Sequence, residues 1–378
     1  MKKFFSILAV ALSLTSVAVM PNSFSVDVSA ASVSAKACVV LDADSGEVVY
    51  EKNISERLPM ASTTKIMSTL IALEGNLDEE FTVDPDAIKV EGSSMGLKEG
   101  YKVTLKKLCY GMMLPSGNDA ANATAVRIAG DIDSFVDMMN QKAKELGLKN
   151  THFVTPSGLD DYTDEHYSTA YDMAVLMKAA LKNKTFREII ATKRITVDMG
   201  EGNSNTLVNT NKLLSYCQGI IGGKTGFTDK AKRCLVSACE RNGATLICVT
   251  LNAPDDWNDH TVLYNQIFQR YQSITLKPSA DSFTLPVVGS ESEYVNAYCG
   301  SVKKSLLDGD ADGISECTVI KPFYYAPVKK GDVMGEVRFI KNSEVIAQSP
   351  IIAGKDAPES KKELGLLDKI ELFFKNLF

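Results

Sequence analysis

Hydrophobic and polar residues follow two different periods along this chain, and the period changes near residue 275. Before that point, apolar residues recur every three or four positions in several stretches, which is typical of helices that pack on a core. After it, apolar and polar residues alternate one by one, as in "GEVRFIKNSEVIAQSPIIA" at 335–353, and strict alternation predicts strands. The pattern therefore predicts a mixed helix-and-strand part followed by a small all-β part.

The first part carries strand patterns at both ends and helix patterns between them. The run 37–53, "ACVVLDADSGEVVYEKN", predicts a hairpin around its Asp-Ser-Gly turn. The runs 233–240 and 244–251 predict a second hairpin, because Asn-Gly between apolar runs favours a tight turn. We expect one antiparallel sheet backed by a helical lobe, which is an α/β (α+β) fold. Helical periodicity covers 62–73, 104–113, 119–128, 132–148 and 168–181.

The N-terminus has the pattern of a secretory signal segment. Two lysines precede an uncharged, mostly apolar run at 4–20. Small residues follow at 28–30 and 33–35, and either stretch can serve as a cleavage signal. The alternative is an uncleaved anchor helix, for which the apolar run is short. We expect a signal segment at 1–35 and an exported protein.

The C-terminus ends in an amphipathic pattern behind a polar linker. Such a helix has little of its own domain to pack against, so we expect it to lie at a membrane surface, with docking on its own domain as the alternative. Five lysines balance five acidic residues from 355 to 378, so attraction to anionic lipid is weak. The apolar face consists of Leu366, Ile370, Phe373, Phe374 and Leu377. The expected divisions are 36–274 for the first domain, 275–356 for the all-β domain and 357–378 for this helix.

Composition and charge narrow the class of protein. The 378 residues are 45% hydrophobic and 23% charged, as in folded globular proteins. The net charge of −6 and the absence of any Lys/Arg run longer than two argue against nucleic-acid binding. The eight cysteines include no C-x-x-C pair and three histidines are present, so we expect no metal site and no cofactor. Cys299 and Cys317 are candidates for one disulfide, whereas five others lie in apolar contexts typical of core thiols.

One short stretch, "PMASTTKIM" at 59–67, begins a helix with three hydroxyls and a lysine. Ser and Thr are ordinary helix N-caps, so the stretch by itself indicates a helix start. Ser62 and Lys65 are three residues apart, however, and therefore share a helix face on which they can exchange a proton. The same S-x-x-K spacing recurs at Ser301 and Lys304 in the all-β part, where we interpret it as coincidence.

Two further motifs support the interpretation of Ser62 and Lys65 as a reactive pair. Ser116-Gly117-Asn118 lies in a loop between two predicted helices, where a hydroxyl and an amide can turn toward a cleft. Lys224-Thr225-Gly226 precedes the strand at 233–240, and we expect it on an edge strand whose glycines let a bound peptide approach closely. In chain order, the three motifs match the S-x-x-K, S-x-N and K-T-G set of penicillin-binding proteins and serine β-lactamases.

The residue types fit nucleophilic catalysis. A serine hydroxyl attacks poorly until a base takes its proton, and no histidine lies near Ser62 in the sequence, so Lys65 is the better candidate base. Lys65 must be neutral to act, and burial plus a second cation lowers the pKa of a lysine. Lys224 can supply that second charge.

The remaining motif residues have roles around the nucleophile. We expect Lys224 and the Thr225 hydroxyl to hold a terminal carboxylate, and Ser116 to relay a proton to the leaving amine. Asn118 is expected to orient Lys65 and the substrate amide. The backbone N–H groups of Ser62 and Phe227 are expected to form the oxyanion hole, with Gly226 beside the substrate.

From Ala37 to Leu276 the sequence resembles a D-alanyl-D-alanine carboxypeptidase, a low-molecular-mass penicillin-binding protein. Further matches are "LDADSGEVVYEKN", "NTHFVTPSGLDD" and "KTGFTDKAKRCLVSA", and the likeness extends more loosely to the all-β domain and the tail. The resemblance implies a β-lactamase/transpeptidase-like catalytic domain at the outer face of the cytoplasmic membrane. It also implies removal of the terminal D-alanine from peptidoglycan stem pentapeptides through an acyl-Ser62 intermediate, and inhibition by β-lactams.

Some positions depart from the family pattern. Phe227 stands where some relatives have histidine, and "NAPDDWNDHTVLYNQIF" lacks the arginine that some relatives use to bind the carboxylate. Carboxylate binding therefore depends more on Lys224 and Thr225. We expect His152 and His166 to make structural polar contacts rather than to act in catalysis.

Two other functions compete with this interpretation. A class A-like β-lactamase would need an acidic residue to drive deacylation, and no E-x-x-L-N segment occurs between Ser116 and Lys224. A catalytically silent protein that binds the cell wall is the second alternative. The intact Ser62 and Lys65 pair argues against it.

Overall fold

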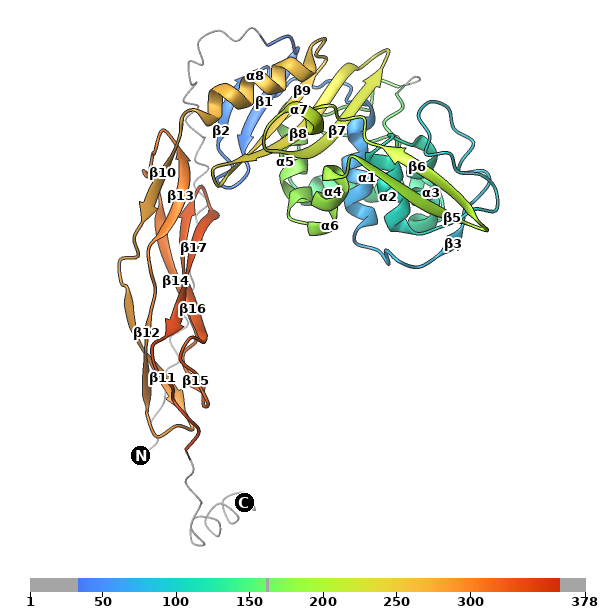
Figure 1. Ribbon diagram of the computed structural model, residues 1–378. Helices are drawn as coiled ribbons and strands as arrows, with labels where there is room; N and C mark the ends of the chain where they lie inside the picture. The colour runs from blue at the N-terminus through green and yellow to red at the C-terminus, as the bar shows by residue number, and fades with distance from the viewer. Residues whose placement is uncertain (1–32, 161–162, 361–378) are drawn as a thin grey trace, which may run out of the picture.

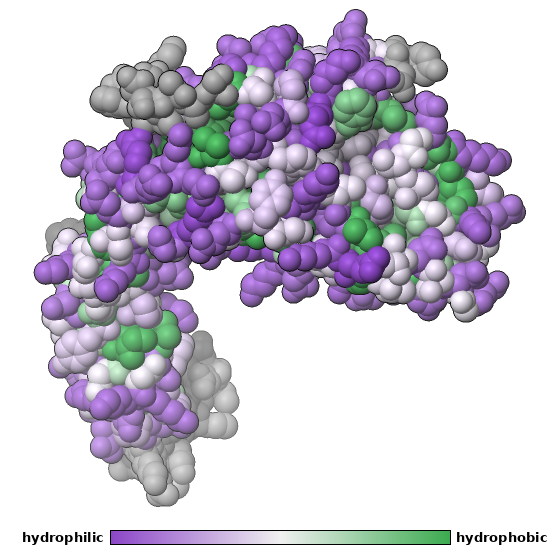
Figure 2. All heavy atoms as spheres, turned by 45° about the horizontal axis from the view of Figure 1, so that its top comes forward, coloured by the Kyte–Doolittle hydropathy of each residue, from purple (hydrophilic) through white to green (hydrophobic). Residues whose placement is uncertain are grey.

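The computed structural model describes residues 33–160 and 163–360, so the expected signal segment up to residue 32 and the expected tail helix from residue 361 lie outside the described residues. Figure 1 shows a mixed helix-and-sheet body and an elongated β body that extends away from one end of it. In these ranges no helix combines the length and apolarity needed to cross a bilayer. The surface in Figure 2 is mostly hydrophilic, with small separate hydrophobic areas.

The central sheet of the first body is antiparallel, as expected. Both predicted hairpins form, and the strand from the N-terminal hairpin pairs directly with a strand from the later one. The K-T-G motif lies on the edge strand, also as expected. The strand order is β2 (Val48–Lys52), β1 (Ala37–Asp42), β9 (Ala244–Leu251), β8 (Lys232–Arg241) and β7 (Ile220–Thr228).

The two faces of this sheet bury different partners because successive side chains of a strand point to opposite sides. Val39, Val236 and Val249 belong to the core shared with the helical lobe. Val40 and Leu235 face the other way, toward α8 (Asp256–Phe268), which covers that side of the sheet in Figure 1. The sequence pattern did not predict α8, because its first turns are rich in Asp and Asn and its apolar stripe begins late.

The helical lobe contains all five predicted helices. Thr104 and Thr169 are N-caps whose hydroxyls accept hydrogen bonds from the backbone N–H groups of Lys107 and Asp172. A sixth helix, α6, was not predicted. The helices are α1 (Lys65–Ala72), α2 (Leu105–Met113), α3 (Asn118–Ala129), α4 (Ile132–Glu145), α5 (Ala170–Leu181) and α6 (Lys184–Ala191).

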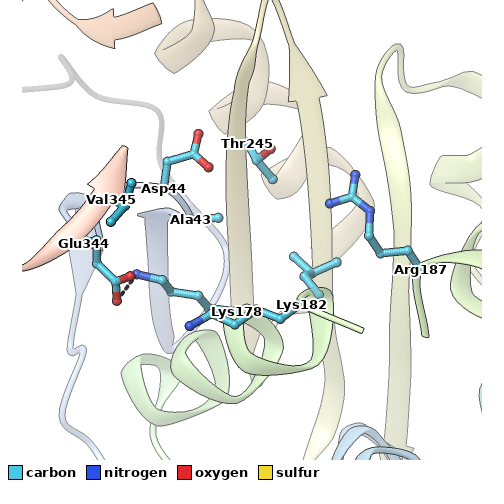
Figure 3. Close-up of a pocket in the computed structure, with 9 residues that line it drawn as sticks. Ala43, Asp44, Lys178, Lys182, Arg187, Thr245, Glu344 and Val345 are labelled. Carbon is cyan, nitrogen blue, oxygen red and sulfur yellow. Dashed lines mark ion pairs between the residues drawn. The ribbon is translucent and has the colours of Figure 1, made fainter. Parts of the chain in front are cut away.

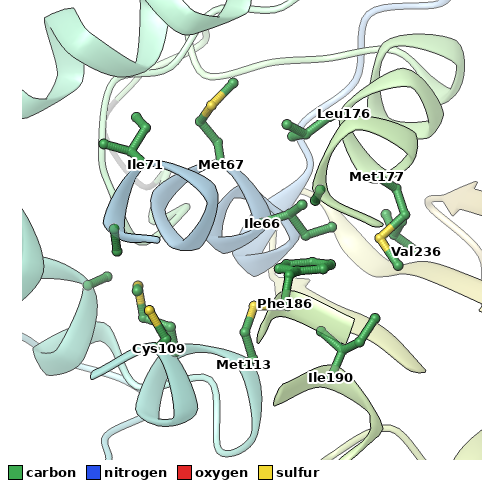
Figure 4. Packing of buried hydrophobic residues seen from close by; sticks show 14 of the residues in the cluster. Ile66, Met67, Ile71, Cys109, Met113, Leu176, Met177, Phe186, Ile190 and Val236 are labelled. Carbon is green, nitrogen blue, oxygen red and sulfur yellow. The ribbon is translucent and has the colours of Figure 1, made fainter. Parts of the chain in front are cut away.

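Helix α1 lies at the centre of the lobe and is buried on nearly all sides, with Leu70 as its one partly exposed residue. It packs against α2, α3, α4 and α5, so its first residue is fixed from several directions. Figure 4 labels Ile66, Met67 and Ile71 of α1 among Cys109, Met113, Leu176, Met177, Phe186, Ile190 and Val236.

Short elements complete the first body. A two-stranded pair joined by a long loop and one hairpin flank the lobe, and a single helical turn precedes the edge strand β7. None of them was predicted, because each is either very short or dominated by polar residues. They are β3 (Phe81–Thr82) with β4 (Lys102–Val103), β5 (Arg194–Gly200) with β6 (Asn203–Val208), and α7 (Leu213–Tyr216).

The second body is all-β, as the alternating pattern predicts. Leu285, Val295 and Val337 are among its buried core residues. Cys299 and Cys317 are both free thiols in the structure. One pair of strands, β10 (Tyr271–Leu276) with β13 (Val302–Leu307), leads into a sheet of order β14 (Ser315–Ile320), β16 (Val333–Lys341), β17 (Glu344–Ala353), β12 (Tyr294–Tyr298), β11 (Ser282–Val288) and β15 (Tyr324–Tyr325).

Polar contacts hold the two bodies together at their junction. The Tyr271 hydroxyl donates to Oδ2 of Asp42 over 2.6 Å, and the expected boundary between residues 274 and 275 lies inside β10. Figure 3 shows a small polar pocket at this junction, where Lys178 of α5 forms an ion pair with Glu344 at 3.0 Å. These contacts fix the end of the β body nearest to the helical lobe.

Candidate active site

The S-x-x-K motif lies in a 3-10 turn, Ala61–Thr64, which runs directly into α1. Ala61 has a positive φ of 48°, a conformation that non-glycine residues rarely adopt. The hydroxyl of Thr63 donates to the Met60 carbonyl at 2.6 Å, and the hydroxyl of Thr64 donates to the Ala61 carbonyl at 2.8 Å. The stretch is a helix start, as expected, but these hydroxyls do not cap it: they bond backwards to carbonyls and stabilise the turn.

His166 supports this turn from the other side. Its Nδ1 accepts the Val154 N–H at 2.9 Å, so Nε2 carries the proton and donates to the Thr64 hydroxyl at 2.8 Å. Burial lowers the pKa of His166 to about 3, so the ring is neutral near pH 7. An added Cβ at Gly158 would overlap the Ala61 carbonyl oxygen. Gly158 and His166 thus lie directly against the turn and support its strained conformation.

Lys65 is fully buried and connects three parts of the site. Its Nζ lies 2.9 Å from Oγ of Ser62, 2.7 Å from Oδ1 of Asn118 and 2.7 Å from the Ser157 carbonyl oxygen. Burial, together with the charge of Lys224, lowers the pKa of Lys65 well below its ordinary value. Two of the three neighbours can only accept hydrogen bonds. The two hydrogens of a neutral amine satisfy them, and its lone pair then faces the Ser62 hydroxyl.

The S-x-N motif lies between α2 and α3, where its asparagine is the first residue of α3. Asn118 is held by its Nδ2, which donates to the Glu91 carbonyl at 2.7 Å. Ser116 is buried and has a positive φ of 66°, which marks a strained turn. Among the described residues, no hydrogen bond links the Ser116 hydroxyl to Ser62 or Lys65. The structure therefore joins Asn118 to the reactive pair directly and Ser116 only through the chain.

Asp119 is a functional residue that sequence reasoning missed. It is buried, and its two carboxylate oxygens accept the backbone N–H groups of Met95, Gly96 and Leu97 over 2.9, 3.1 and 3.0 Å. These bonds fasten the loop before α2 across the start of α3, beside the S-x-N motif. An acid directly after S-x-N was visible in the sequence, but nothing in the sequence pointed to partners more than twenty residues upstream.

The K-T-G motif lies on β7. Lys224 is fully buried, and its Nζ donates to the Thr225 carbonyl at 2.7 Å. Burial lowers the pKa of Lys224 to about 7. A Cβ added to Gly226 would lie 3.2 Å from the Ser62 backbone nitrogen, so β7 passes directly beside the S-x-x-K turn at this glycine. Phe227 follows, with a side chain that is 61% exposed.

Thr210 is a second residue that sequence reasoning missed. Its hydroxyl lies 2.8 Å from the Thr225 hydroxyl, and its backbone N–H donates to the Leu114 carbonyl at 3.1 Å. Leu114 comes two residues before Ser116, so Thr210 ties the S-x-N loop to the K-T-G strand. The side chain of Asn209 anchors this segment by donating to the carbonyls of Ile190 and Thr192.

Arg233, on the strand that pairs with the K-T-G strand, makes its contacts away from the motif. The Nε of Arg233 donates to Asp256 at 3.1 Å, and its guanidinium lies 5.4 Å from the Trp257 ring centre at the start of α8. Arg233 therefore contributes to the α8 side of the sheet. Lys224 and the hydroxyls of Thr225 and Thr210 lie at the strand edge, where the sequence predicts binding of a carboxylate.

Comparison with known protein families covers most of the chain. Residues 24–255 match the family described as D-alanyl-D-alanine carboxypeptidase. Residues 273–359 match the family described as penicillin-binding protein 5, C-terminal domain. The two matches fall on the first body and on the β body.

Individual relatives agree with these matches. The chain is 33% identical over 334 residues to the D-alanyl-D-alanine carboxypeptidase DacF of Bacillus subtilis (strain 168), with 85% of each chain covered. It is 34% identical over 361 residues to DacC of Escherichia coli (strain K12), with 90% of this chain and 88% of the relative covered.

Solved structures show the same similarity. The D-alanyl-D-alanine carboxypeptidase DacD from Francisella tularensis superimposes with a TM-score of 0.61 at 27% identity, covering 86% of this chain and 94% of the other. Penicillin-binding protein 5 from Haemophilus influenzae gives a TM-score of 0.63 at 25% identity, covering 88% and 100%.

Proposed function

The chain belongs to the D-alanyl-D-alanine carboxypeptidase family, and we propose that Ser62 is its nucleophile and Lys65 the base that activates Ser62. The protein is a serine-type D-Ala-D-Ala carboxypeptidase that acts on peptidoglycan. The observation that carries the assignment is the surroundings of Lys65. Its amine is buried, two carbonyl-type oxygens take its hydrogens, and Ser62 Oγ lies 2.9 Å away on the remaining side.

In the first half of the reaction, Ser62 Oγ attacks the carbonyl carbon of the D-Ala-D-Ala peptide bond and Lys65 Nζ takes the hydroxyl proton. The carbonyl oxygen becomes negative and accepts hydrogen bonds from the backbone N–H groups of Ser62 and Phe227. The proton then passes through the Ser116 hydroxyl to the leaving nitrogen. The C–N bond breaks, D-alanine departs as an amine, and an acyl-Ser62 ester remains.

In the second half, a water molecule attacks the ester carbon while Lys65 takes a proton from it. The C–O bond to Ser62 breaks while Lys65 returns that proton to Ser62 Oγ, and the shortened stem peptide leaves with a new carboxylate. A β-lactam enters the same sequence, but its leaving nitrogen stays tethered to the acyl group. Retention of a penicillin adduct on Ser62 follows from this chemistry.

The substrate's own terminal carboxylate binds at the strand edge. Lys224 supplies a positive charge there, and Thr225 supplies a hydroxyl donor. We include Thr210 in this group, because its hydroxyl is 2.8 Å from that of Thr225 and its backbone is fixed to the S-x-N loop. Two adjacent hydroxyls and an ammonium replace the arginine that the sequence lacks at this site.

The domains divide this work. We assign catalysis to 36–274 and a spacer role to 275–360, because residues 357–360 pair with the β body, and we place the tail that follows on the membrane surface. The protein then acts outside the cytoplasmic membrane on stem pentapeptides, after cleavage of a signal segment within 1–35. The spacer assignment agrees with the elongated β body that extends away from the catalytic body in Figure 1.

The test uses the purified protein with fluorescent penicillin and, in parallel, a peptide that ends in D-Ala-D-Ala. We expect a stable adduct, located on Ser62 by mass spectrometry, and release of one D-alanine per peptide. Rapid turnover of penicillin without D-alanine release would make the protein a β-lactamase. Absence of both adduct and D-alanine would support the silent wall-binding alternative.

A further inference from the structure

The far end of the β body exposes apolar side chains at the point where the chain continues into its tail. The backbone N–H of Ser360 donates to the Gly289 carbonyl at 2.7 Å, next to the end of β11. Ser290 and Glu359 form a bridge at the same place. The described part of the chain therefore ends beside β11, at the end of the β body that Figure 1 places opposite the catalytic body.

The exposed apolar residues at this end form a group that we call the distal tip. Tyr325 is 72% exposed, Val288 is 49% exposed and Phe323 is 44% exposed, although large apolar side chains are usually buried. The rings of Phe323 and Tyr325 lie 5.4 Å apart in an edge-to-face arrangement. The distal tip consists of Val288, Phe323 and Tyr325.

Strand register places Val288 and Tyr325 side by side, because they pair between β11 and β15. The turn of the β16–β17 hairpin is at the opposite end of the β body, because Glu344 there contacts Lys178 of the catalytic body. Val288 and Tyr325 are therefore far from the junction between the two bodies.

The charges around the distal tip are mixed. Lys321, Lys329 and Lys330 are exposed there, and no ion pair within the described part of the chain engages their ammonium groups. Exposed acidic residues at the same end offset them in net charge, so long-range attraction to an anionic surface is small. Those acidic residues are Glu291, Glu293, Asp332, Asp356 and Glu359. This surface can therefore bind a partner through apolar contact rather than through net charge.

We propose that the distal tip is a second contact with the phospholipid membrane, formed by the folded β body in addition to the tail. Aromatic side chains flanked by lysines suit the interface between headgroups and acyl chains. The tip lies where a sequence with its own apolar face, including Phe373 and Phe374, begins. A single apolar anchor binds a membrane only marginally, and two anchors on one chain give stable attachment.

This inference rests on the membrane location stated in the proposed function, and it adds an orientation. A tail alone does not fix the angle between the β body and the membrane surface. A tip that enters the interface fixes the end of the β body, so the catalytic body stands away from the membrane at the other end. Ser62 is then presented to the wall and not to the lipid.

The first experiment measures depth. The full chain contains Trp257 as its single tryptophan, so Tyr325→Trp adds a second fluorophore at the tip. Vesicles of phosphatidylcholine with brominated acyl chains should quench this variant more than vesicles of ordinary phosphatidylcholine, whereas the wild-type protein should show no difference. Equal fluorescence of the variant in both kinds of vesicle would overturn the proposal.

The second experiment measures affinity by cosedimentation with phosphatidylcholine vesicles. The double variant F323S/Y325S should bind at least about tenfold more weakly than wild type, because two exposed aromatic side chains no longer enter the interface. Tyr216→Ser is the matched control, since Tyr216 is 57% exposed on the catalytic body. Unchanged binding of the double variant would also overturn the proposal.

The tail is tested separately with F373S/F374S. If only this variant loses binding, the membrane location stands and the distal tip is not a contact. If wild type does not bind vesicles at all, both the membrane location and the tip contact are wrong. Sedimentation without vesicles tests whether a second copy of the chain binds the tip instead of lipid. A wild-type dimer that dissociates in F323S/Y325S would assign the tip to this second copy and overturn the lipid contact.

Discussion

The chain contains the S-x-x-K spacing twice, once at the start of a helix and once at the start of a strand. Ser62 and Lys65 lie where a 3-10 turn enters α1, so residues three apart share a face and their side-chain atoms lie 2.9 Å apart. Ser301 precedes β13, on which Lys304 lies. Residues three apart on an extended strand point to opposite sides, so this serine and lysine do not meet.

The two lysines also differ in their partners. Lys65 is buried among uncharged oxygens, forms no ion pair within the described residues, and has its pKa lowered. Lys304 pairs with the Asp44 carboxylate at 2.5 Å across the junction of the two bodies. A carboxylate partner stabilises the ammonium form of a lysine, which cannot serve as a base. Burial without an acidic partner is therefore what separates a candidate base from a structural cation.

The largest expected effect comes from removing the two serines in turn. Ser62→Ala should lower D-alanine release by at least about 10³-fold and abolish penicillin labelling, because no other group supplies the nucleophile. Ser301→Ala should leave both rates within twofold of wild type. Steady-state kinetics and labelling on the two variants measure this, and labelling that survives in Ser62→Ala would refute the assignment.

Replacing Lys65 and Lys304 with arginine, one at a time, distinguishes a lysine that acts as a base from a lysine that acts only as a cation. Lys65→Arg keeps a positive charge but cannot accept a proton at working pH, so acylation should slow by about 10²–10⁴-fold. Lys304→Arg can still pair with Asp44, and its acylation rate should stay unchanged. Stopped-flow measurement of penicillin acylation gives both rates. Near-normal acylation by Lys65→Arg would mean that charge, not proton transfer, is the role of Lys65.

The pH profile tests the other buried lysine. Burial lowers the pKa of Lys224 to about 7, so above this pH the amine is neutral and binds a carboxylate poorly. kcat/KM for a peptide ending in D-Ala-D-Ala should fall about tenfold per pH unit at alkaline pH. In Lys224→Arg the guanidinium stays charged, and the alkaline fall should move up by at least about two pH units. An identical alkaline limb in both proteins would remove Lys224 from carboxylate binding.

Thr210 gives a smaller effect. Thr210→Val should lower kcat/KM by about tenfold for a substrate with a free carboxylate, because one hydrogen bond to a charged group is lost. The same peptide with a C-terminal amide should lose little. Thr206→Val is the matched control, since the hydroxyls of Thr206 and Thr196 also form an exposed pair, 2.9 Å apart on the β5–β6 hairpin. Equal losses for acid and amide substrates would make Thr210 purely structural.

The smallest effect is expected at the second S-x-x-K copy. Lys304→Met removes the ion pair to Asp44, which is partly exposed, and should lower the free energy of unfolding by about 1 kcal/mol or less. Lys303→Met is the control, because Lys303 is exposed on the opposite side of the same strand. Thermal unfolding compares the two variants. Equal unfolding temperatures would show that the junction does not depend on this pair.

The sequence determined the elements whose signal lies within a few residues. The hairpin at 244 follows from Asn-Gly between apolar runs, and the helices α2 and α5 follow from their apolar periods and threonine caps. The sequence pattern did not predict α8 or the β5–β6 hairpin, because their polar residues mask a short apolar stripe. Their stability comes from packing on the sheet and on the lobe, which is information that no local window contains.

For the site, the sequence by itself supplied the residue types and the order of the three motifs. The sequence already favoured the first S-x-x-K copy over the second, and the tertiary structure shows that its serine and lysine meet. The tertiary structure also brought the Ser157 carbonyl to Lys65, Asp119 to the loop at 95–97 and Thr210 to Thr225. The physical reason is that a buried amine takes its acidity and orientation from groups around it in space, and these groups come from segments far apart along the chain.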